Sequence, residues 1–464
     1  MKKTFLFYDI ETTGLSKPFD QILQFAAIRT DLALNEIERH ECRVRLNKDI
    51  FPAPGALLTH GLGIREIQEG ISEYEAIQKI HQWMNVPGTI SLGYNTLGFD
   101  DEFLRFGFYR HLLKPYTHQY ANGCGRMDLY PITLMFYLFK PAILNWREVN
   151  GRKSLKLEYI NQANQFAKGA AHDAMVDVEV TLALAKHLMT ESTMWEYLCG
   201  YFQKEIDLTR MQPLQKDMAL LIQGRIGTEA NYQCPVMFLG QHKHYRNQFV
   251  WLRLDSETLQ QTTLETINTC TFSFNKKPGE PNFILPMTER FLTQIDSARI
   301  TLAQNNQRWL KENPKIFQAI TDWHLNFTYP VFPNVDYDAR LYLNGFFSRD
   351  EDFFCERFQK STPKEKAKLA ESAQSDLLQT LTTRLIGRHF PEALTSSLED
   401  RFAEYLAAVK TPEDSKILID HQGRKRLTPH LALAEIATLR AEPEKEKTQL
   451  KLLEEYEAYL QKLS

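Results

Sequence analysis

The sequence contains little cysteine. Six cysteines are spread over 464 residues, and none belongs to a Cys-x-x-Cys pair. A zinc ribbon requires such pairs, and a small disulfide-bonded domain requires a much higher density of cysteine. Both classes are therefore excluded, and we expect a cytoplasmic protein whose thiols stay reduced.

Long apolar runs are also missing. A membrane helix needs about 20 consecutive apolar residues, and no stretch of this sequence approaches that length. The basic start Met1-Lys2-Lys3 resembles the beginning of a signal peptide, but Asp9 and Glu11 soon interrupt the apolar run that follows it. We therefore expect a protein that has no membrane-spanning segment.

An excess of positive charge is missing as well. The chain has 55 Lys and Arg against 58 Asp and Glu, which gives a formal net charge of -3. Domains that bind nucleic acid are usually strongly basic. If nucleic acid is the substrate, local basic residues, aromatic residues and metal ions must offset the repulsion. One such basic run is Arg424-Lys425-Arg426.

The length predicts two to four domains, and the change in residue pattern along the chain favours three. Short apolar runs alternate with amphipathic stretches over residues 1–190, which is typical of an α/β sheet domain. Residues 191–345 carry strand-like runs, and residues 346–464 are rich in helix formers. We therefore predict an α/β domain, a β-rich domain and a helical C-terminal domain, in that order and with these limits.

Several individual elements are also predicted from periodicity and from capping residues. The expected strands are residues 4–10, 21–30, 41–46, 89–94, 249–254 and 271–274. The expected helices are residues 72–84, 174–188 and 295–310, together with a final helix that places Leu450, Leu453, Tyr456 and Leu460 on one face.

Two carboxylates stand at the end of the first expected strand. Asp9 and Glu11 follow an apolar run and precede Thr12-Thr13-Gly14. Alternate side chains of a strand share a face, so both carboxylates project to the same side. The ends of sheet strands commonly carry functional sites in α/β proteins, and the pair therefore suggests a site for a divalent metal ion.

A third carboxylate stands where an expected strand is followed by a helix. The segment 93–104 places Asp100 at the start of that helix. Taken alone, Asp100 or Asp101 would be interpreted as a helix cap, because carboxylates favour the positive end of the helix dipole.

A histidine and a fourth carboxylate surround the start of the helix expected from residue 174. His172 and Asp177 are five residues apart, which is roughly 140° around an ideal helix, so they cannot face one site if both are helical. We therefore expect His172 on the preceding loop, Asp173 as the N-cap and Asp177 one turn inside the helix.

Together these segments resemble a known family. Asp9 to Gly14, Asn95 to Phe103 and His172 to Asp177 are similar to the three exonuclease motifs of the DnaQ-like, or DEDDh, 3′–5′ exonuclease superfamily. The overall length and three further segments resemble the bacterial exodeoxyribonuclease I family within it, and the resemblance covers nearly the whole chain. Those segments are Gln24-Phe25-Ala26, Pro54-Gly55-Ala56 and Asn344-Gly345-Phe346-Phe347-Ser348.

The resemblance implies a fold and an activity. The fold would be a ribonuclease H-like exonuclease domain, an SH3-like β-rich domain and an α-helical C-terminal domain. The activity would be metal-dependent hydrolysis of single-stranded DNA from its 3′ end to 5′-mononucleotides, in DNA repair and recombination. The implied catalytic residues are Asp9, Glu11, Asp100, His172 and Asp177.

The chemistry of these residues agrees with that implication. Four clustered carboxylates repel one another unless cations neutralise them, and their hard oxygen atoms suit two Mg²⁺ ions, with Mn²⁺ as a substitute. Two such ions support phosphodiester hydrolysis. Histidine exchanges protons near neutral pH, so His172 is expected to be the general base.

The same resemblance implies contacts with substrate and partner. In similar enzymes, residues after the acidic pair hold the terminal nucleotide. From the residues themselves, Arg105 or Lys156 could pair with phosphate. Tyr116 and Tyr120, in a polar loop rich in His and Gln, could stack on bases, with ordinary loop packing as the alternative. The expected substrate contacts are Glu11, Thr12, Thr13, Leu15, Arg105, Tyr116, Tyr120 and Lys156. Similar enzymes also bind the acidic C-terminal tail of single-stranded DNA-binding protein, and the expected contacts are Lys140 and Tyr197.

Two alternatives are weighed against this interpretation. An RNA-trimming or proofreading DEDDh nuclease would resemble the first domain alone, whereas this chain adds about 270 residues beyond it. A non-catalytic single-strand-binding protein would be expected to have lost a metal ligand, and all five signature positions are filled here. An enclosing three-domain chain needs no partner subunit, so we expect a monomer.

Overall fold

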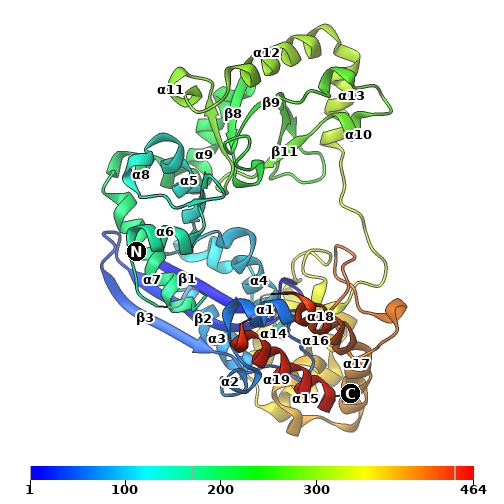
Figure 1. The fold of residues 1–464 in the computed structure, drawn as a ribbon. Coiled ribbons are helices and arrows are strands. Elements are labelled where there is room, and N and C mark those ends of the chain that lie inside the picture. The colour runs from blue at the N-terminus through cyan, green and yellow to red at the C-terminus, as the bar shows by residue number, and fades with distance from the viewer. Residues whose placement is uncertain (1, 170–171, 444–445, 464) are drawn as a thin grey trace. The chain divides into compact units, whose positions relative to one another are not determined.

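The computed structural model describes residues 2–169, 172–443 and 446–463. The chain divides into two compact units, and each unit contains segments from distant parts of the sequence (Figure 1). Unit 1 comprises Met1–Arg126, Ala167–Leu182 and Pro330–Ser464, and unit 2 comprises Met127–Phe166 and Ala183–Tyr329.

A mixed five-stranded sheet forms the centre of unit 1. Its strand order is β3-β2-β1-β4-β5, in which β1 pairs antiparallel with β2 and parallel with β4. The pair β2 and β3 is antiparallel, and the pair β4 and β5 is parallel. The bounds are β1 (Thr4–Thr12), β2 (Ile22–Thr30), β3 (Glu36–Arg43), β4 (Thr89–Leu92) and β5 (Gly125–Arg126).

The burial of each strand follows its place in the sheet. The inner strand β2 is buried along its whole length, as its sequence ILQFAAIRT permits. Strand β3, at the edge, has the polar sequence EIERHECR and is mostly exposed. The expected strand 41–46 is therefore wrong by about five residues at its start, because apolar content marks inner strands better than solvated edge strands.

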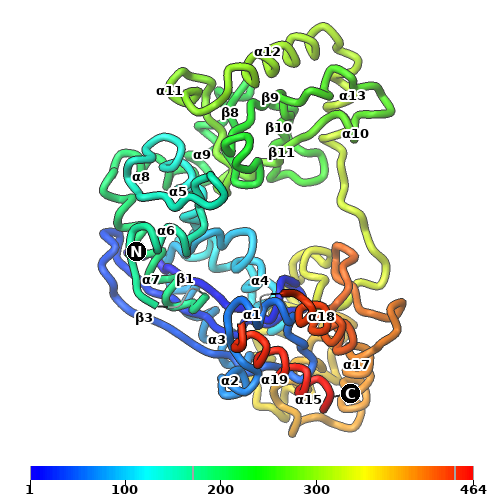
Figure 2. Tube along the Cα trace, in the orientation of Figure 1, coloured from blue at the N-terminus to red at the C-terminus, as the bar shows by residue number. Residues whose placement is uncertain are grey.

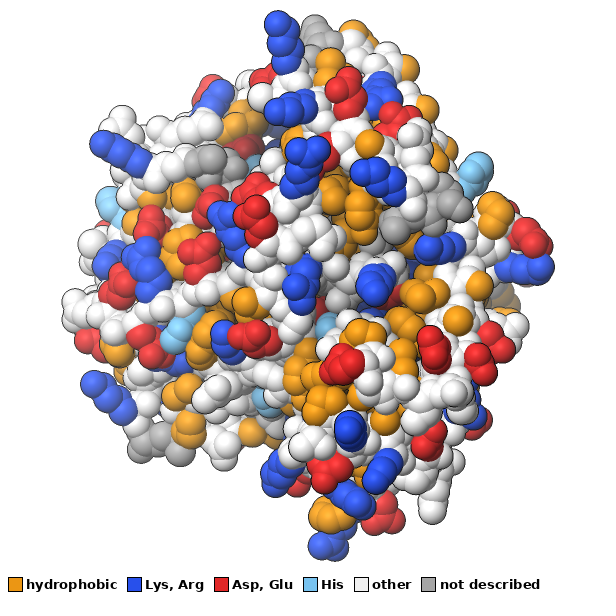
Figure 3. Space-filling model, turned by 90° about the horizontal axis from the view of Figure 1, so that it is seen from below, with side chains coloured by type: hydrophobic (Ala, Val, Ile, Leu, Met, Phe, Trp, Pro, Cys, Tyr) orange, Lys and Arg blue, Asp and Glu red, His pale blue; other side chains and the backbone are white. Residues whose placement is uncertain are grey.

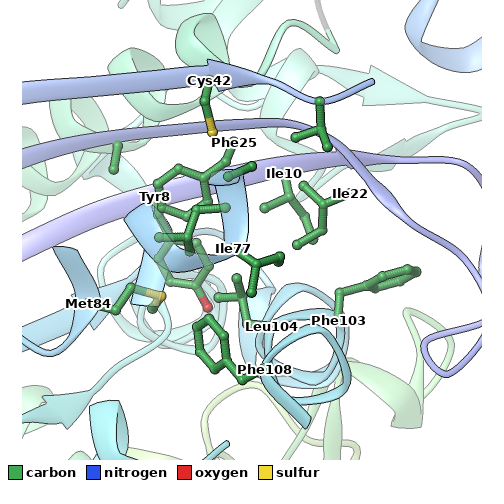
Figure 4. Close-up of a cluster of buried hydrophobic side chains, with 14 of the residues drawn as sticks. Tyr8, Ile10, Ile22, Phe25, Cys42, Ile77, Met84, Phe103, Leu104 and Phe108 are labelled. Atoms are coloured by element: carbon green, nitrogen blue, oxygen red, sulfur yellow. The ribbon is translucent and has the colours of Figure 1, made fainter. Parts of the chain in front are cut away.

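One apolar core lies between the sheet of unit 1 and two helices. Side chains from β1, β2, α3 and α4 meet there, as Tyr8, Phe25, Ile77 and Phe108 illustrate (Figure 4). Ser72 caps α3 by accepting a hydrogen bond from the backbone N–H of Glu75, so the serine start predicted for this helix is confirmed. The helices of this part are α1 (Pro54–His60), α2 (Ile64–Gln68), α3 (Glu73–Met84), α4 (Asp100–Arg110) and α7 (Ala174–Met189).

The C-terminal helices complete unit 1. Leu453, Tyr456 and Leu460 of the last helix are fully buried in one cluster with Leu57 and Ile64 of α1 and α2. Figure 2 shows this last helix beside the first two helices of the chain. The C-terminal helices are α14 (Arg349–Lys360), α15 (Pro363–Ser372), α16 (Asp376–His389), α17 (Ser396–Val409), α18 (Pro429–Ala441) and α19 (Lys447–Leu463).

A buried network of charged side chains also joins these helices to the sheet region. Asp49 is fully buried and lies 2.8 Å from Arg388 and 3.2 Å from Arg426. The Tyr405 hydroxyl donates a hydrogen bond of 2.7 Å to Asp49, and Arg388 also pairs with Asp338 at 2.6 Å. Burial alone would raise the pKa of Asp49, but the two guanidinium groups outweigh it and hold that pKa well below its ordinary value.

Unit 2 is built around an antiparallel five-stranded sheet. Its strand order is β11-β10-β9-β8-β12. The strands of unit 2 are β6 (Glu148–Val149), β7 (Arg152–Lys153), β8 (Met218–Ile222), β9 (Gln233–Gln241), β10 (Phe249–Arg253), β11 (Ser273–Lys276) and β12 (Phe283–Pro286). Its helices are α5 (Leu129–Phe139), α6 (Leu157–Asn164), α8 (Ser192–Cys199), α9 (Lys204–Met211), α10 (Ile267–Cys270), α11 (Glu289–Leu292), α12 (Ser297–Glu312) and α13 (Pro314–Leu325).

The predicted succession of an α/β part, a β-rich part and a helical part is confirmed. The SH3-like character of the second part and the limits 1–190, 191–345 and 346–464 remain predictions. Among the described residues, no helix combines the length and apolarity that crossing a membrane requires. Acidic and basic side chains are interspersed over the face drawn in Figure 3, in keeping with the net charge of -3.

Candidate active site

Asp9 and Glu11 lie at the end of β1, on the face opposite to its core residues. Tyr8 and Ile10 point into the cluster beneath the sheet (Figure 4). Since neighbouring side chains of a strand alternate, Asp9 and Glu11 point to the other face. The pairing of β1 with β2 shifts register between Glu11 and Thr12, so the regular strand ends directly after the second carboxylate.

The segment after β4 carries the third carboxylate. A Cβ atom on Gly93 would lie 2.4 Å from the carbonyl oxygen of Tyr8, so glycine allows this segment to pass directly against β1. Asn95 then adopts a left-handed conformation with φ of 63°. Asp100 follows as the first residue of α4 and is 6% exposed. The chain thus delivers Asp100 to the end of the sheet that carries Asp9.

The start of α7 has the arrangement that its sequence predicts. Asp173 Oδ1 accepts hydrogen bonds from the backbone N–H groups of Met175 at 3.0 Å and Val176 at 3.3 Å, so it is the N-cap. His172 precedes the helix, has a left-handed φ of 66° and is exposed. Asp177 lies one turn inside the helix.

A contact between α7 and β2 places this turn beside the acidic pair. The backbone N–H of Ala174 donates to Oε1 of Gln24 at 3.5 Å, and Gln24 is the residue paired with Glu11 in the sheet. As a result, one ligand atom each of Glu11, His172 and Asp177 lie within 4.8 Å of one another. Segments that are more than 160 residues apart in the sequence therefore converge here.

The four carboxylates act on one another electrostatically. Burial, followed by repulsion from Asp100, Asp177 and Glu11, raises the pKa of Asp9 well above its ordinary value. Burial, followed by repulsion from Asp177 and Asp100, raises the pKa of Glu11 to about 8. Asp9, Glu11, Asp100 and Asp177 are therefore close enough to act on one another as one acidic site.

The sequence did not indicate that His60 belongs to this neighbourhood. Its Nδ1 accepts a hydrogen bond of 3.0 Å from the backbone N–H of Leu62, at the end of α1. Burial and, second, repulsion from His172 lower the pKa of His60 to about 4. A neutral imidazole therefore stands near His172. The local sequence around His60 shows only a helix end before Gly61, so no sequence signal marked it.

The loop after β1 buries its threonines and exposes its leucine. Thr12 Oγ1 donates to the Gly14 carbonyl at 2.8 Å, and Thr13 Oγ1 donates to Asp20 Oδ1 at 2.9 Å. A Cβ atom on Gly14 would lie 2.5 Å from Oδ2 of Asp20, so glycine is required for this close turn. Leu15 is 76% exposed, which is unusual for a leucine beside buried charge.

Arg105 lies in a buried acidic environment. It is 7% exposed and pairs with Asp101 at 2.7 Å and with Glu102 at 2.5 Å. Its guanidinium carbon also lies 5.6 Å from the centre of the Tyr116 ring, which is partly buried. Tyr120, in the same loop, is 68% exposed. Of these three predicted contacts, Tyr120 alone presents most of its side chain to solvent.

Asp101 has a structural role that the helix-cap interpretation did not anticipate. It is fully buried and pairs with Arg126 at 2.6 Å and with His118 Nε2 at 2.9 Å, in addition to Arg105. Burial would raise the pKa of Asp101, but the guanidinium groups of Arg105 and Arg126, together with the hydrogen bond to His118, outweigh it and lower that pKa. Asp101 therefore fixes the loop that carries Tyr116 beside the start of α4.

Three predicted contacts lie in unit 2. Lys156 precedes α6, and its side chain is 70% exposed, with Glu158 at 3.8 Å. Lys140 follows α5 and pairs with Glu191. Tyr197 lies on α8 and is stacked beneath the guanidinium of Arg210, whose carbon atom is 4.2 Å from the ring centre.

The basic run Arg424-Lys425-Arg426 does not form the surface cluster that its sequence suggested. Arg426 is 3% exposed, and its guanidinium is bound to Asp49 and to the Tyr405 hydroxyl. Lys425 pairs with Asp414. Arg424 and Lys425 are exposed, whereas Arg426 is held in an internal ion pair, so the expectation for Arg426 as a nucleic-acid contact is wrong.

Comparison with known proteins adds independent findings. A family model described as exonuclease matches residues 6–185, and one described as exonuclease I C-terminal domain matches residues 335–463. Exodeoxyribonuclease I of Escherichia coli strain K12 is 30% identical over 444 residues, which is 89% of this chain and 91% of that protein.

Solved structures of exonuclease I are also similar to this chain. The chain is similar to the zinc-bound crystal structure of E. coli exonuclease I with single-stranded DNA, with a TM-score of 0.85, 26% identity and full coverage of both chains. It is also similar to exonuclease I in a crystal structure of SSB and exonuclease I with the inhibitor CFAM, with a TM-score of 0.84, 25% identity and full coverage of both chains.

Proposed function

The chain belongs to the exodeoxyribonuclease I family of DnaQ-like 3′–5′ exonucleases, and from this membership we propose that it hydrolyses single-stranded DNA to 5′-mononucleotides by a two-metal mechanism. The observation that carries the mechanism is the convergence of four carboxylates, where burial and, second, mutual repulsion raise the pKa of Asp9 and Glu11. Such a cluster is costly to hold in a fold unless cations complete it.

We assign Asp9, Glu11, Asp100 and Asp177 as the residues that hold the metal ions. The donor set fits, because it consists of hard carboxylate oxygens and because cations would offset the repulsion that, after burial, contributes to raising the pKa of Glu11 to about 8. The relative from E. coli has been crystallised with zinc. Oxygen donors of this kind favour Mg²⁺ under physiological conditions, with Mn²⁺ as a substitute.

Two divalent cations, when bound, supply positive charge to the scissile phosphate and lower the pKa of the attacking water. His172 is the proposed general base, because it is exposed on a loop and lies within 4.8 Å of Glu11 and Asp177. Asp173, which caps α7, is a positioning residue for both neighbours.

The loop after β1 is the proposed seat of the 3′-terminal nucleotide. Thr12 and Thr13 fix the loop through internal hydrogen bonds, which leaves Leu15 exposed as an apolar contact for the terminal base. Glu11 stands at the start of this loop and is assigned to both metal and nucleotide. A rigid turn with an exposed apolar side chain suits a terminal base of any identity.

Further contacts are proposed along the strand. Tyr120 offers an exposed ring for stacking, and Tyr116 offers a second ring that is supported from behind by Arg105. Because Arg105 is buried and paired with two acids, its proposed contribution is through Tyr116 and not as an isolated phosphate contact. The exposed Lys156 is the proposed phosphate contact in unit 2.

Lys140 and Tyr197 are the proposed contacts for the acidic C-terminal tail of single-stranded DNA-binding protein. The similar structure that contains SSB supports a partner of this kind. Tyr197 is an apolar surface backed by Arg210, and Lys140 supplies positive charge, which suits an acidic and partly apolar peptide. We further propose that the protein acts as a monomer in the cytoplasm, in DNA repair and recombination.

The decisive experiment uses end-labelled oligonucleotides of one sequence, prepared as single-stranded DNA, duplex DNA and single-stranded RNA. With Mg²⁺, we expect the single-stranded DNA alone to be shortened from its 3′ end to mononucleotides, and we expect EDTA to abolish the reaction. Preferred cleavage of RNA would instead indicate a trimming nuclease. Binding without cleavage in both Mg²⁺ and EDTA would indicate a binding protein.

A further inference from the structure

A second group of potential metal ligands lies within unit 1, apart from the four acidic residues. Glu73 is the first residue of α3, His111 directly follows α4 and His389 is the last residue of α16. One ligand atom from each of these side chains lies within 4.8 Å of the other two. Glu73 is 2% exposed and His111 is 1% exposed. These three residues are called the α3-α4-α16 cluster below.

The distances in the cluster match the coordination shell of zinc. On a tetrahedral zinc ion with Zn–N bonds of about 2.0 Å, two ligand nitrogens lie about 3.3 Å apart. The Nε2 atoms of His111 and His389 are separated by 3.3 Å. His111 Nε2 and Glu73 Oε2 are separated by 3.8 Å, so a small movement of the carboxylate brings all three atoms into the first coordination shell.

We propose that Glu73, His111 and His389 form a structural zinc site that ties α3 and α4 to α16. Two histidines and one carboxylate are a common set of protein ligands for zinc, and a water molecule would complete the tetrahedron. Soft thiolates are not required for such a site. The proposal concerns a position separate from the acidic exonuclease site and does not depend on the chemistry of that site.

The hydrogen bonding of His111 prepares it as a ligand. Its Nδ1 lies 2.8 Å from the carbonyl oxygen of Gly107, and a carbonyl only accepts, so Nδ1 carries the proton. In the neutral ring, Nε2 then presents its lone pair to His389 and Glu73. Metal-bound histidines characteristically donate their other N–H group to a carbonyl or carboxylate in this way.

Burial favours the uncharged form of both histidines. It lowers the pKa of His111 below its ordinary value, and burial together with repulsion from His111 lowers the pKa of His389 well below it. Neutral imidazole is the form that binds zinc. In the metal-free protein His389 Nε2 donates to His111 Nε2, so zinc binding requires the proton of His389 to move from Nε2 to Nδ1.

The surrounding charges orient Glu73 without occupying all of its oxygen lone pairs. Arg110 pairs with Oε1 at 3.2 Å, while its other nitrogen donates to the Pro18 carbonyl at 2.6 Å. Asn47 donates to Oε2 of Glu73, which leaves a second lone pair on that oxygen. The nearby Arg388 is already paired with Asp49 and Asp338, so its charge is compensated.

A zinc ion here would connect the exonuclease part of the chain with its C-terminal helices. Glu73 and His111 belong to the first 126 residues, whereas His389 is 278 residues beyond His111. A metal that binds only the folded arrangement stabilises it by mass action. Zinc is therefore expected to raise the melting temperature of the protein without taking part in hydrolysis.

The test uses the full chain carrying Glu11→Gln and Asp177→Asn, which removes two of the four carboxylates of the acidic site and so weakens zinc binding there. After removal of metals with a chelator, the protein is equilibrated with zinc chloride and passed through a desalting column. We expect about one zinc per chain by elemental analysis, and we expect the visible absorption of four-coordinate Co²⁺ when cobalt replaces zinc.

A third substitution then identifies the ligands. Adding His389→Gln is expected to weaken zinc binding by at least roughly tenfold and to remove the cobalt bands. The matched control is His421→Gln, because His421 is also a partly buried histidine of unit 1 but stacks on Phe106 with ring centres 5.7 Å apart, outside the cluster. The control is expected to keep the zinc.

Three results would overturn the proposal. The first is the absence of bound zinc when His389 is intact. The second is a zinc affinity that changes less than tenfold on His389→Gln. The third is a loss of zinc affinity in the His421→Gln control that equals the loss on His389→Gln. If His389→Gln prevents folding, the protein that retains His389 decides the question. A rise of about 3 °C or more in its melting temperature with zinc, together with the cobalt bands, supports the site, and the absence of either refutes it.

Discussion

Unit 1 contains two groups of carboxylates, one partly buried and one fully buried, whose pKa values shift in opposite directions. At the end of β1, Asp9 and Glu11 face other acids, and their pKa values are raised. Around Asp49 and Asp338, each acid faces arginine, and the pKa values of both are lowered although burial acts to raise them. Both clusters lie in unit 1, and the side chains whose pKa values shift are carboxylates in each.

The two groups differ in their neighbours: acids that face arginine suit a structural role, whereas acids that face other acids suit the proposed metal site. The protein itself supplies the cations for Asp49 and Asp338, so that network is complete and holds helices together. The charged groups that act on the pKa values of Asp9 and Glu11 are other acids, so cations from solution are their proposed complement. The predictions below test this contrast, beginning with the largest expected effect.

Asp177→Asn should lower the rate of hydrolysis of single-stranded DNA by roughly 1,000-fold or more, because it removes a proposed metal ligand. The same change should raise the stability of the metal-free protein, because one repelling charge is lost. The measurements are single-turnover cleavage and thermal unfolding in EDTA. Retained turnover would remove Asp177 from the metal site, and a large loss of stability would abolish the contrast with Asp49.

Asp49→Asn should destabilise the protein by about 3 kcal/mol, because it leaves Arg388 and Arg426 buried without one of their acids. Urea unfolding measures this loss. At a temperature where the variant is folded, the cleavage rate per folded molecule should remain close to that of the unmodified protein. A selective loss of catalysis with unchanged stability would show that the network is part of the active site.

Metal affinity should increase with pH. In the metal-free fold the pKa of Glu11 is raised from 4.5 to about 8, so between these values the folded state retains a proton that the unfolded state releases. Stability of the metal-free protein therefore falls as pH rises through this window. Below about pH 8 a bound metal must displace that proton, so affinity should rise by about tenfold per pH unit for each proton displaced.

Calorimetric titration with Mn²⁺ at several pH values measures this dependence. Glu11→Gln is the matched variant, since it keeps the shape of the side chain and removes one titrating group. Its affinity should be lower and should depend less steeply on pH. An affinity of the unmodified protein that is independent of pH from about 6 to 8 would contradict the electrostatic account of the site.

Leu15→Ala should have the smallest effect. Because Leu15 is 76% exposed, its loss should leave the free energy of unfolding within about 0.5 kcal/mol of the original. If it contacts the terminal base, the KM for single-stranded DNA should rise by about fivefold with kcat little changed. Steady-state kinetics on a short oligonucleotide measure both. An unchanged KM would remove Leu15 from the nucleotide site.

Local chemistry made parts of the site predictable. The position of Asp9 and Glu11 at a strand end followed from an apolar run that stops, and the caps Ser72 and Asp173 followed from their place before amphipathic stretches. The loop position of His172 followed from helix geometry alone. The family prediction is confirmed by the relative from E. coli, whereas the role of each site residue stays a prediction.

Long-range pairing could not be predicted. Asp49 and Arg388 are 339 residues apart, and neither sequence neighbourhood indicates the other. For the same reason Arg426 was interpreted as a surface contact, although an internal acid binds it. The predicted position of β3 was wrong because an edge strand is stabilised by backbone pairing on one side and needs little apolar content.

The packing of α19 on α1 and α2 has a consequence for biosynthesis. A ribosome that has completed residues 1–190 has not yet made Leu453, Tyr456 or Leu460, which cover Leu57 and Ile64 in the finished protein. The nascent chain therefore keeps an apolar surface uncovered until its last helix emerges, and chaperones are expected to shield it during that interval. A fragment that ends near residue 190 should aggregate for the same reason.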